Sequence, residues 1–191
     1  MVAANGIPFA IYYNPANIIL SDRVNIYAGY RNFYGMPEIY QADIVSNFSA
    51  LNTPFSLAFS KYGNDLYSEI QISIGSNISF NPDFIIGASL QLYSLTISNY
   101  GSSSTWGLNI GMKYNVVEKI SLGAHVTNIN NPTIGQTNEE LPKTFSLGVR
   151  YDIFPKSVIL FELFRDISYE QDYRCGFEYE ILNKTNLRIG I

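Results

Sequence analysis

Apolar and polar residues alternate along most of this chain. Between Trp106 and Val116 every even residue is apolar or aromatic, and every odd residue is glycine, asparagine or lysine. A period of two is that of a β-strand, whose successive side chains point to opposite faces. The polar positions are mostly Gly, Ser, Asn, Thr and Gln, with few of the Lys and Glu residues that cover a soluble sheet. The pattern predicts strands with one apolar face and one weakly charged polar face.

The alternation predicts eleven strands joined by connections of two lengths. The expected strands are 23–32, 38–48, 54–61, 66–79, 84–97, 104–116, 119–129, 143–153, 157–166, 172–182 and 186–191. Tight turns are expected at 81–83, 117–118, 154–156 and 183–185, and longer loops at 98–103, 130–142 and 167–171. Consecutive antiparallel strands need only hairpins, so the chain is expected to run up and down. One strand departs from the pattern, because Val158 and Leu160 make the second face of 157–166 apolar as well.

Composition favours a transmembrane β-barrel. Charged residues are 15% of the chain, against roughly 25% in soluble domains. No run of about 18 apolar residues offers a membrane helix, and a barrel needs none because only alternate residues touch lipid. Many expected strands have about ten residues or more, close to the roughly 9–11 that cross a bilayer. The chain has 15 Tyr and 12 Phe, and tyrosines near expected strand ends, such as Tyr30, Tyr93 and Tyr151, fit interfacial girdles.

A soluble β-sandwich or lipocalin-like barrel would show the same period with its apolar face inward. The two folds differ in whether residues such as Ile72, Leu90, Ile110 and Leu147 face lipid or meet in a compact centre. Short turns on one rim and longer loops on the other are typical of the bacterial outer membrane, with the short rim periplasmic. Because bacterial single-chain barrels have an even number of strands, eleven strands predict that the barrel is incomplete at the C-terminus.

Two regions are expected. Residues 1–22 form an N-terminal lead-in or a plug in the lumen, because Gly6–Asp22 lacks the strict period, and residues 23–191 form the barrel. The start at Met1 lacks the basic residues and apolar stretch of a signal peptide, which predicts mature numbering or a fragment of a longer gene. Seven glycines share the polar face, which suggests relief of crowding and local strand bending: they are at 87, 107, 111, 123, 148, 176 and 190.

Charged residues on the polar face are candidates for a lumen network. Opposite charges on neighbouring strands can hold the strands in register, or the same residues can line a path for a polar solute. Lipid-facing charges would instead cost about 2–4 kcal/mol each at mid-bilayer. The lumen-facing candidates are Arg31, Asp43, Glu69, Lys113, His125, Arg150, Asp152, Glu162, Arg174, Glu178, Glu180 and Arg188, of which Arg174, Glu178, Glu180, Arg150 and Arg188 form the densest group.

Little in the sequence indicates catalysis. His125 is the only histidine and shares a face with Ser121 and Thr127. A Ser-His hydrolase is one interpretation, but nothing marks a particular serine, so we interpret His125 as a hydrogen-bonded polar residue and the protein as not an enzyme. One His and one Cys give no metal-ligand spacing, and no phosphate-binding glycine loop is present, so no metal or cofactor is expected. The net charge of -4 without a basic stripe argues against nucleic acid. Cys175 is interpreted as a small lipid-facing hydrophobe.

Three short segments resemble one family of outer-membrane barrels. Tyr13-Asn14-Pro15-Ala16-Asn17 is similar to the Y-x-NPA-G-L motif near the mature N-terminus of PorV/PorQ-like and FadL-like barrels, with Asn17 and Ile18 in place of Gly and Leu. Phe59-Ser60-Lys61-Tyr62-Gly63-Asn64-Asp65-Leu66-Tyr67 resembles PorV/PorQ-like sequences. So does Asn128-Ile129-Asn130-Asn131-Pro132-Thr133-Ile134-Gly135, running into Glu139-Glu140-Leu141-Pro142.

The resemblance implies a barrel of about fourteen strands, again an even number. PorV-like members act in type IX secretion, where they receive exported proteins, and FadL-like members pass hydrophobic small molecules through the barrel wall. The charged, glycine-lined interior suits a greasy ligand poorly, which favours protein secretion, and a structural barrel without transport is the third alternative. The expected partners are the lipid bilayer, lipopolysaccharide and exported or secretion-system proteins. The loop expected to contact protein partners is Asn130–Pro142, with Asn130, Asn131, Pro132, Gly135, Glu139 and Glu140.

Overall fold

The computed structural model describes residues 2–4, 7–33, 35–182 and 185–191, and in it the chain forms one large antiparallel sheet. Its eleven strands lie side by side in chain order, so that each inner strand pairs with two neighbours and the first and last strands are the edges. The strands are β1 (Asn25–Phe33), β2 (Met36–Ala50), β3 (Thr53–Gly63), β4 (Tyr67–Asn81), β5 (Phe84–Ile97), β6 (Gly101–Val117), β7 (Ile120–Val126), β10 (Thr144–Phe154), β11 (Ser157–Asp166), β12 (Gln171–Leu182) and β13 (Thr185–Gly190). The predicted all-β, up-and-down arrangement is confirmed, and each expected strand overlaps one observed strand.

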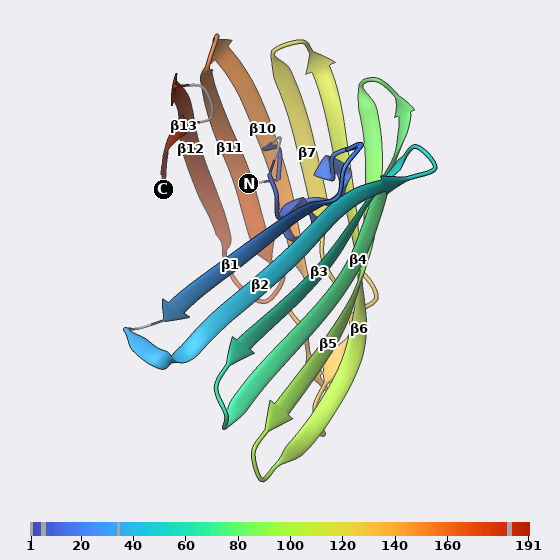
Figure 1. Cartoon of the computed structure of the whole chain (residues 1–191), viewed down its shortest axis with the longest axis vertical. Helices are drawn as coiled ribbons and strands as arrows, with labels where there is room; N and C mark the ends of the chain where they lie inside the picture. Colours follow the sequence, from blue (N-terminus) through green and yellow to red (C-terminus); the bar gives the residue numbers. More distant parts are fainter. Residues whose placement is uncertain (1, 5–6, 34, 183–184) are drawn as a thin grey trace.

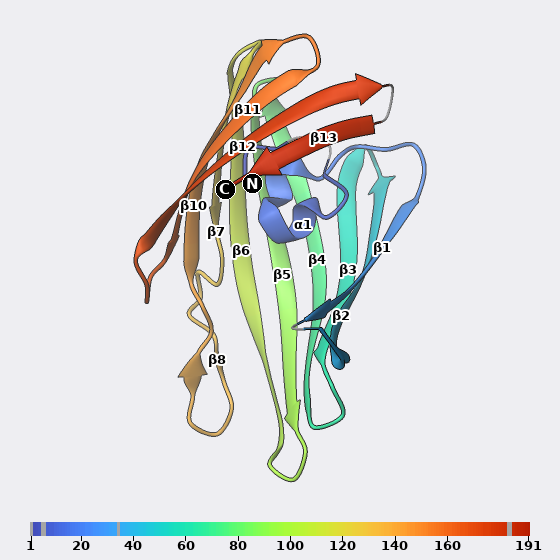
Figure 2. The same ribbon diagram turned by 90° about the vertical axis from the view of Figure 1, so that its left-hand side faces the viewer.

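The sheet curves into a deep trough (Figures 1 and 2). Its two edges are β1 and β13, and within the described residues no backbone pairing joins these edges. The hollow of the trough contains the beginning of the chain, including α1 (Ala10–Tyr13) and the 3₁₀ turn η1 (Pro15–Asn17), as Figure 2 shows. In the part of the chain that the structure describes, no helix has the length and hydropathy needed to cross a membrane.

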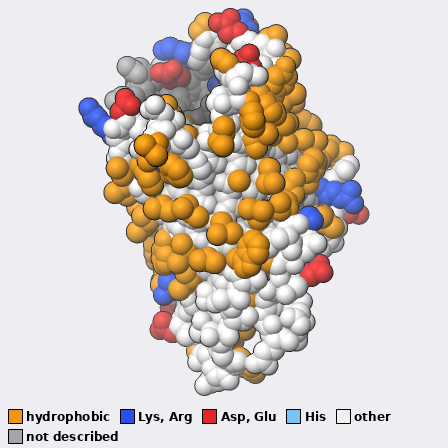
Figure 3. All heavy atoms as spheres, turned by 90° about the vertical axis from the view of Figure 1, so that its right-hand side faces the viewer, with side chains coloured by type: hydrophobic (Ala, Val, Ile, Leu, Met, Phe, Trp, Pro, Cys, Tyr) orange, Lys and Arg blue, Asp and Glu red, His pale blue; other side chains and the backbone are white. Residues whose placement is uncertain are grey.

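The apolar residues of the strands lie on the convex face and are exposed. Ile72, Leu90, Ile110 and Leu147 retain 50%, 39%, 42% and 45% of their accessible surface, so they do not meet in a compact centre. Figure 3 shows hydrophobic side chains over the middle and upper parts of the convex face, while its lower end is mostly uncharged. The neighbouring polar residues are buried on the concave face, among them Ser56, Ser73, Ser89, Gln91 and Asn109. The sheet is therefore polar inside and apolar outside.

The two ends of the trough differ in their connections. One end, which we call the turn rim, carries two-residue turns at 51–52, 82–83, 118–119 and 155–156. At the first of these, Leu51 and Asn52 both have positive φ, 51° and 60°, as the twist of a two-residue hairpin requires. The opposite end, the loop rim, carries connections at 64–66, 98–100, 127–143 and 167–170.

The loop-rim connections are shorter than the alternation predicts, with one exception. The expected loop 98–103 is only three residues long, because Ser102 and Ser103 pair with Thr96 and Leu95 and so extend β6. Only 127–143 is long, and it contains the small hairpin of β8 (Thr133–Ile134) and β9 (Glu139–Glu140). Two-residue strands are too short to produce a readable alternation, so this hairpin was not predicted.

Tyr93 corrects one expectation about the aromatic residues. It was grouped with the interfacial tyrosines, but it lies on the concave face with Gln91, and its hydroxyl donates to Gln91 Oε1 at 2.9 Å and to Asn128 Oδ1 at 3.2 Å. The alternation itself places Tyr93 on the polar face, since odd residues of β5 face inward. Its position near a strand end obscured that signal.

Candidate functional site

The concave face is occupied by the N-terminal segment, residues 2–4 and 7–22. Two small apolar clusters attach it to the sheet. Ile11 packs with Val45 of β2 and Ala58 of β3, joined by Phe9 and Tyr12. Apolar residues on a polar face thus mark where the segment docks.

The second cluster lies across the trough from the first. Ala4 packs with Val158 and Leu160 of β11, joined by Ile7. These two residues of β11 are the ones that broke the alternation of this strand. They are 8% and 4% exposed, so contact with the N-terminal segment explains their apolar character.

Four glycines on adjacent strands form the surface beneath the segment. This glycine stripe consists of Gly87, Gly111, Gly123 and Gly148, in which Gly87 pairs with Gly111 and Gly123 pairs with Gly148 across strands. A Cβ at Gly87 would lie 2.3 Å from Ala16 N, and one at Gly123 would lie 2.7 Å from Val2 O. Because these residues have no side chains, the backbone of the segment rests directly on the backbone of the sheet. This contact is the relief of crowding that the glycines of the polar face predict.

Asparagine side chains hold the Asn-Pro-Ala turn in place. The Asn14 Oδ1 atom accepts from Ala16 N, and its Nδ2 atom donates to Val2 O and Met112 O, each at 3.0 Å. Asn77 of β4 donates from Nδ2 to the carbonyls of Pro15, Ala16 and Ile18 at 2.8–3.3 Å. Buried backbone carbonyls need such donors. The motif is therefore a fixed structural joint between segment and sheet.

Two further asparagines extend these contacts. Asn17 donates from Nδ2 to Val2 O at 2.9 Å, and Asn47 of β2 donates to Pro8 O at 2.9 Å. The sequence analysis did not single out Asn47 or Asn77. Because the concave face contains many Ser and Asn residues, composition alone does not separate these anchoring residues from the rest.

Glu162 connects the charged residues of β11 and β12 to the N-terminal segment. Its carboxylate accepts from the backbone N–H of Val2 and pairs with Arg174 of β12, whose Nη1 lies 3.3 Å from Oε1. The Arg174 guanidinium also stacks over the ring of Phe164 at 4.0 Å from its centroid. Glu162 is 4% exposed, and a buried carboxylate requires this pairing.

The structure separates the proposed charge network into smaller groups. Arg150 pairs with Asp152 at 2.7 Å, and Arg188 with Glu178 at 2.6 Å, so the dense group of β10 to β13 is only partly brought together. Within the described residues, six of the proposed members form no ion pair. These are Arg31, Asp43, Glu69, Lys113, His125 and Glu180.

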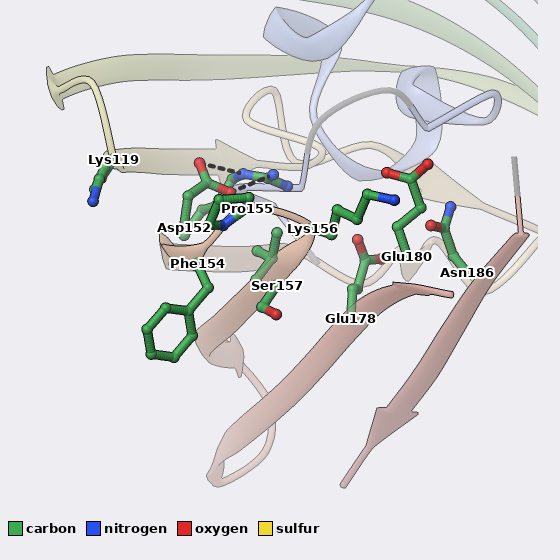
Figure 4. A pocket seen from close by; sticks show the side chains of 11 residues that line it. Lys119, Asp152, Phe154, Pro155, Lys156, Ser157, Glu178, Glu180 and Asn186 are labelled. Carbon is green, nitrogen blue, oxygen red and sulfur yellow. Dashed lines mark hydrogen bonds and ion pairs between the residues drawn. The ribbon is translucent and has the colours of Figure 1, made fainter. Parts of the chain in front are cut away.

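A cavity of about 460 Å³ lies near the turn rim between β10, β11, β12 and β13 (Figure 4). Lys156 extends toward the carboxylates of Glu178 and Glu180, while Phe154 points away from them. Three basic and three acidic side chains line the cavity. The mixed charges give this cavity no clear preference for an anion or a cation.

His125 is buried on β7, with 4% of its surface exposed. Within the described residues its Nε2 atom has no hydrogen-bond partner, although the sequence analysis expected one. Its cross-strand neighbour on β10 is Ser146. In the described part of the chain, no group of three or more His, Cys, Asp or Glu residues is placed to hold a metal ion.

The connection 127–143 is fastened to β6 by two asparagines. The Asn130 side chain makes hydrogen bonds to the backbone of β6 like those of a neighbouring strand. Its Oδ1 accepts from Leu108 N and its Nδ2 donates to Trp106 O, both at 2.9 Å. The buried Asn128 donates from Nδ2 to Pro142 O at 2.8 Å, and its backbone N–H donates to Asn109 Oδ1 at 2.9 Å. These contacts close the base of the connection and hold the β8–β9 hairpin against the loop rim.

The residues expected to contact partners fall into two groups. Asn131 and Gly135 have positive φ, 49° and 81°, so they shape the turns of the connection, a common role of these residue types. Asn130 is used in the attachment to β6, and Pro132 is buried. Glu139 and Glu140 of β9 are exposed. Of the six, these two carboxylates are the ones whose side chains are offered to solvent without a structural contact in the described residues.

We expect Asn128→Ala to loosen the connection 127–143 while leaving the sheet intact. The substitution removes the bond to Pro142 O and one of the two acceptors for Tyr93, and it places alanine at φ 51°. Loss of a buried hydrogen bond costs about 1–3 kcal/mol. Hydrogen exchange of the amides in 129–141 should accelerate correspondingly. Gln136→Ala, an exposed position in the same connection, is the control, and equal exchange in both variants would contradict this role of Asn128.

Comparisons with protein-family models, with curated proteins and with solved structures find no match for this chain.

Proposed function

We propose that this chain forms the wall of a bacterial outer-membrane β-barrel of the PorV/PorQ type, which takes part in protein secretion by contacting exported proteins at its loop rim. The observation that carries the membrane assignment is the orientation of the sheet: apolar side chains are exposed on the convex face and polar ones are buried on the concave face. An exposed apolar surface of this extent is unstable in water. The outward face of a transmembrane barrel is apolar because it contacts the hydrocarbon tails of the lipid.

The height of the apolar band supports this assignment. On β5, outward apolar positions run from Phe84 to Leu92 and are followed by Ser94 and Thr96. Nine residues correspond to roughly 26–30 Å of strand. At the tilt of an outer-membrane strand this suits the apolar band of about 25 Å. The remaining residues of β5 and the β6 residues paired with them then project beyond the bilayer at the loop rim.

Aromatic residues border the band on both sides. Near the turn rim, Phe48 stacks on Phe55 with centroids 5.8 Å apart, and Phe84 contacts Phe80 and Tyr114 at 6.0 and 6.3 Å. Toward the loop rim, Tyr30 stacks on Tyr40 at 5.7 Å, and Trp106 is exposed on β6. Aromatic residues are enriched at both membrane–water interfaces, so two such borders are typical of a transmembrane protein.

Closure of the barrel is part of the same proposal. In the described part of the chain the sheet has two unpaired edges, β1 and β13, and open edges do not occur in hydrocarbon. Additional strands, giving about fourteen in all, would join these edges and bring the total to an even number. The N-terminal segment would then lie in the lumen as a plug.

The occupied concave face favours protein contact over a conduit for hydrophobic solutes. The N-terminal segment is fixed by Asn14, Asn77 and Glu162, and the surrounding side chains are Ser, Asn, Gln and charged residues. A greasy ligand would have to displace these hydrogen bonds and desolvate the polar groups. The firmly attached β8–β9 hairpin, in contrast, presents Glu139 and Glu140 in a defined position outside the bilayer.

We expect the paired substitution Glu139→Lys with Glu140→Lys to reduce the recovery of exported proteins on this barrel by at least about fivefold, or ~1 kcal/mol. Reversing two exposed carboxylates repels a partner with a basic surface. The measurement is affinity capture of exported proteins from cells that make the full-length protein, with outer-membrane fractionation in parallel. The variant should fractionate like the unmodified protein.

Asp83→Lys with Glu118→Lys is the matched control, because it makes the same change of net charge in exposed turns of the opposite, turn rim. The control should retain capture. Equal recovery from both variants would contradict the role of the hairpin. A protein that fractionates with the outer membrane but captures no exported protein would support the structural barrel instead.

A further inference from the structure

A second cavity, of about 350 Å³, lies between the N-terminal segment and the concave side of β1 to β4. Aromatic residues of the segment form one wall and polar residues of the sheet form the other. Its lining includes Phe9, Tyr12, Tyr13, Arg31, Gln41 and Asp43. Unlike the cavity at the turn rim, it is lined by a single carboxylate, that of Asp43.

Asp43 is a buried carboxylate without a counter-ion in the described residues. The residue is 8% exposed, and its described polar contact is with Gln41, whose Nε2 donates to Oδ1 at 3.0 Å. Arg31 lines the same cavity but stacks over the Phe33 ring, with 5.7 Å between its Cζ and the centroid. A buried charge left without an ionic partner is costly, and a cation supplied from outside relieves that cost.

The aromatic wall is suited to the same kind of ligand. The Phe9 Cζ atom lies 3.6 Å from the Cβ position at Gly29, and the Asp43 side chain lies 3.8 Å from that position, so the ring and the carboxylate lie close together where the two walls meet. Aromatic faces attract cations within about 6 Å of the ring centroid. A carboxylate beside aromatic rings is therefore an arrangement that recognises an organic ammonium group.

Tyr12 contributes an unused polar group at this site. Its hydroxyl is buried and has no hydrogen-bond partner among the described residues. Burial, with a smaller effect of the Asp43 carboxylate, raises the pKa of Tyr12 above its ordinary value. The hydroxyl therefore keeps its proton and can both donate to and accept from a ligand.

We propose that this cavity binds a small organic cation, with the ammonium group at the Asp43 carboxylate and its apolar part against Phe9 and Tyr12. The cavity volume of about 350 Å³ admits a molecule with one ring. The site is formed by the N-terminal segment and β1 to β4 alone. It does not depend on barrel closure or on a secretion partner, so its failure and that of the proposed function are distinguishable.

The test is isothermal titration of the full chain with benzylammonium chloride, benzyl alcohol and benzoate. These probes share a ring and differ in charge. The protein is kept in a maltoside detergent, because amine-oxide and choline detergents carry the cationic group under test. We expect saturable binding of benzylammonium, at least tenfold weaker binding of benzyl alcohol and no binding of benzoate. Absence of benzylammonium binding, or equal binding of all three probes, would overturn the proposal.

Two variants test the contacts with the ligand, and a third is the control. Asp43→Asn keeps the shape and an acceptor for Gln41, and it should weaken benzylammonium binding at least tenfold. Tyr12→Phe removes a hydroxyl that no described residue bonds, so folding should be retained while binding weakens severalfold. Asp65→Asn makes the same charge change in an exposed turn and should leave binding unchanged. Undiminished binding by Asp43→Asn, with far-ultraviolet circular dichroism showing the native sheet, would refute the assignment.

Discussion

Gly87→Ala is expected to displace the N-terminal segment from the concave face. The added Cβ would lie 2.3 Å from Ala16 N and 2.4 Å from Pro15 C, and these are backbone atoms that cannot rotate away. Overpacking of this kind costs about 1–3 kcal/mol. Here it also acts on the turn that Asn77 and Asn14 hold in place. We expect faster hydrogen exchange of the amides in 14–18. The free energy of unfolding should fall by about 1–3 kcal/mol.

Gly29→Ala is the matched control for this experiment. It lies on the same face, but its Cβ would meet Phe9 Cζ at 3.6 Å and Asp43 at 3.8 Å, which are ordinary contacts. Its stability should stay within about 0.5 kcal/mol of that of the unmodified chain. If Gly87→Ala behaved like Gly29→Ala, the segment would not rest on the glycine stripe as described.

Leu90→Arg tests the apolar band. Leu90 is an outward residue in the middle of β5 and is 39% exposed. If this face contacts hydrocarbon, an arginine there should lower the free energy of unfolding from lipid vesicles by about 2–4 kcal/mol. An outward arginine in water would have nearly no effect, so the substitution distinguishes the two solvents. The measurement is denaturant titration of the protein folded into vesicles.

Leu51→Arg provides the comparison at the edge of the band. Leu51 lies in a turn of the turn rim and is 99% exposed. Arginine near the interface costs about 0–1 kcal/mol, so this variant should remain close to the unmodified chain. Equal stabilities of the Leu90 and Leu51 variants in vesicles would be incompatible with a transmembrane sheet.

The alternation of the sequence predicted the strands because each strand carries its own signal. The even apolar positions of β6, from Trp106 to Val116, define both the strand and its outward face. These residues face outward in the structure, and the face that they form is exposed. The composition of the polar face, which is rich in Ser and Gly, predicts this orientation. Local pattern and tertiary arrangement agree across the sheet except where the apolar Val45, Ala58, Val158 and Leu160 face the N-terminal segment.

The docking of the N-terminal segment could not be predicted with the same certainty, because it depends on contacts between distant residues. Because Gly6–Asp22 lacks a strict period, the sequence is compatible with either a lead-in or a plug at 1–22. The residues that receive the segment were visible as anomalies: Val45, Val158 and Leu160 are apolar on a polar face, and the glycines share that face. Taken singly, these residues indicate no common surface, and it is the register across β5, β6, β7 and β10 that aligns the glycines beneath the segment.

The roles of the asparagines in the connection 127–143 could not be predicted for a second reason. Asn130 and Asn131 are both expected to contact partners, yet Asn130 bonds to β6 and Asn131 shapes a turn. Asparagine serves all three purposes with the same side chain. Its role is set by the backbone conformation and by neighbours such as Trp106 and Leu108, which sequence spacing does not reveal.

The contact between Val2 and Glu162 joins residues 160 positions apart. Nearly the whole sheet must therefore be assembled before the first residues of the chain can take up their final places. Contacts of such high sequence separation slow folding, because a long loop must close before they are made. The N-terminal segment is consequently expected to be a late addition to the folding pathway, one that locks a curvature the strands have already reached.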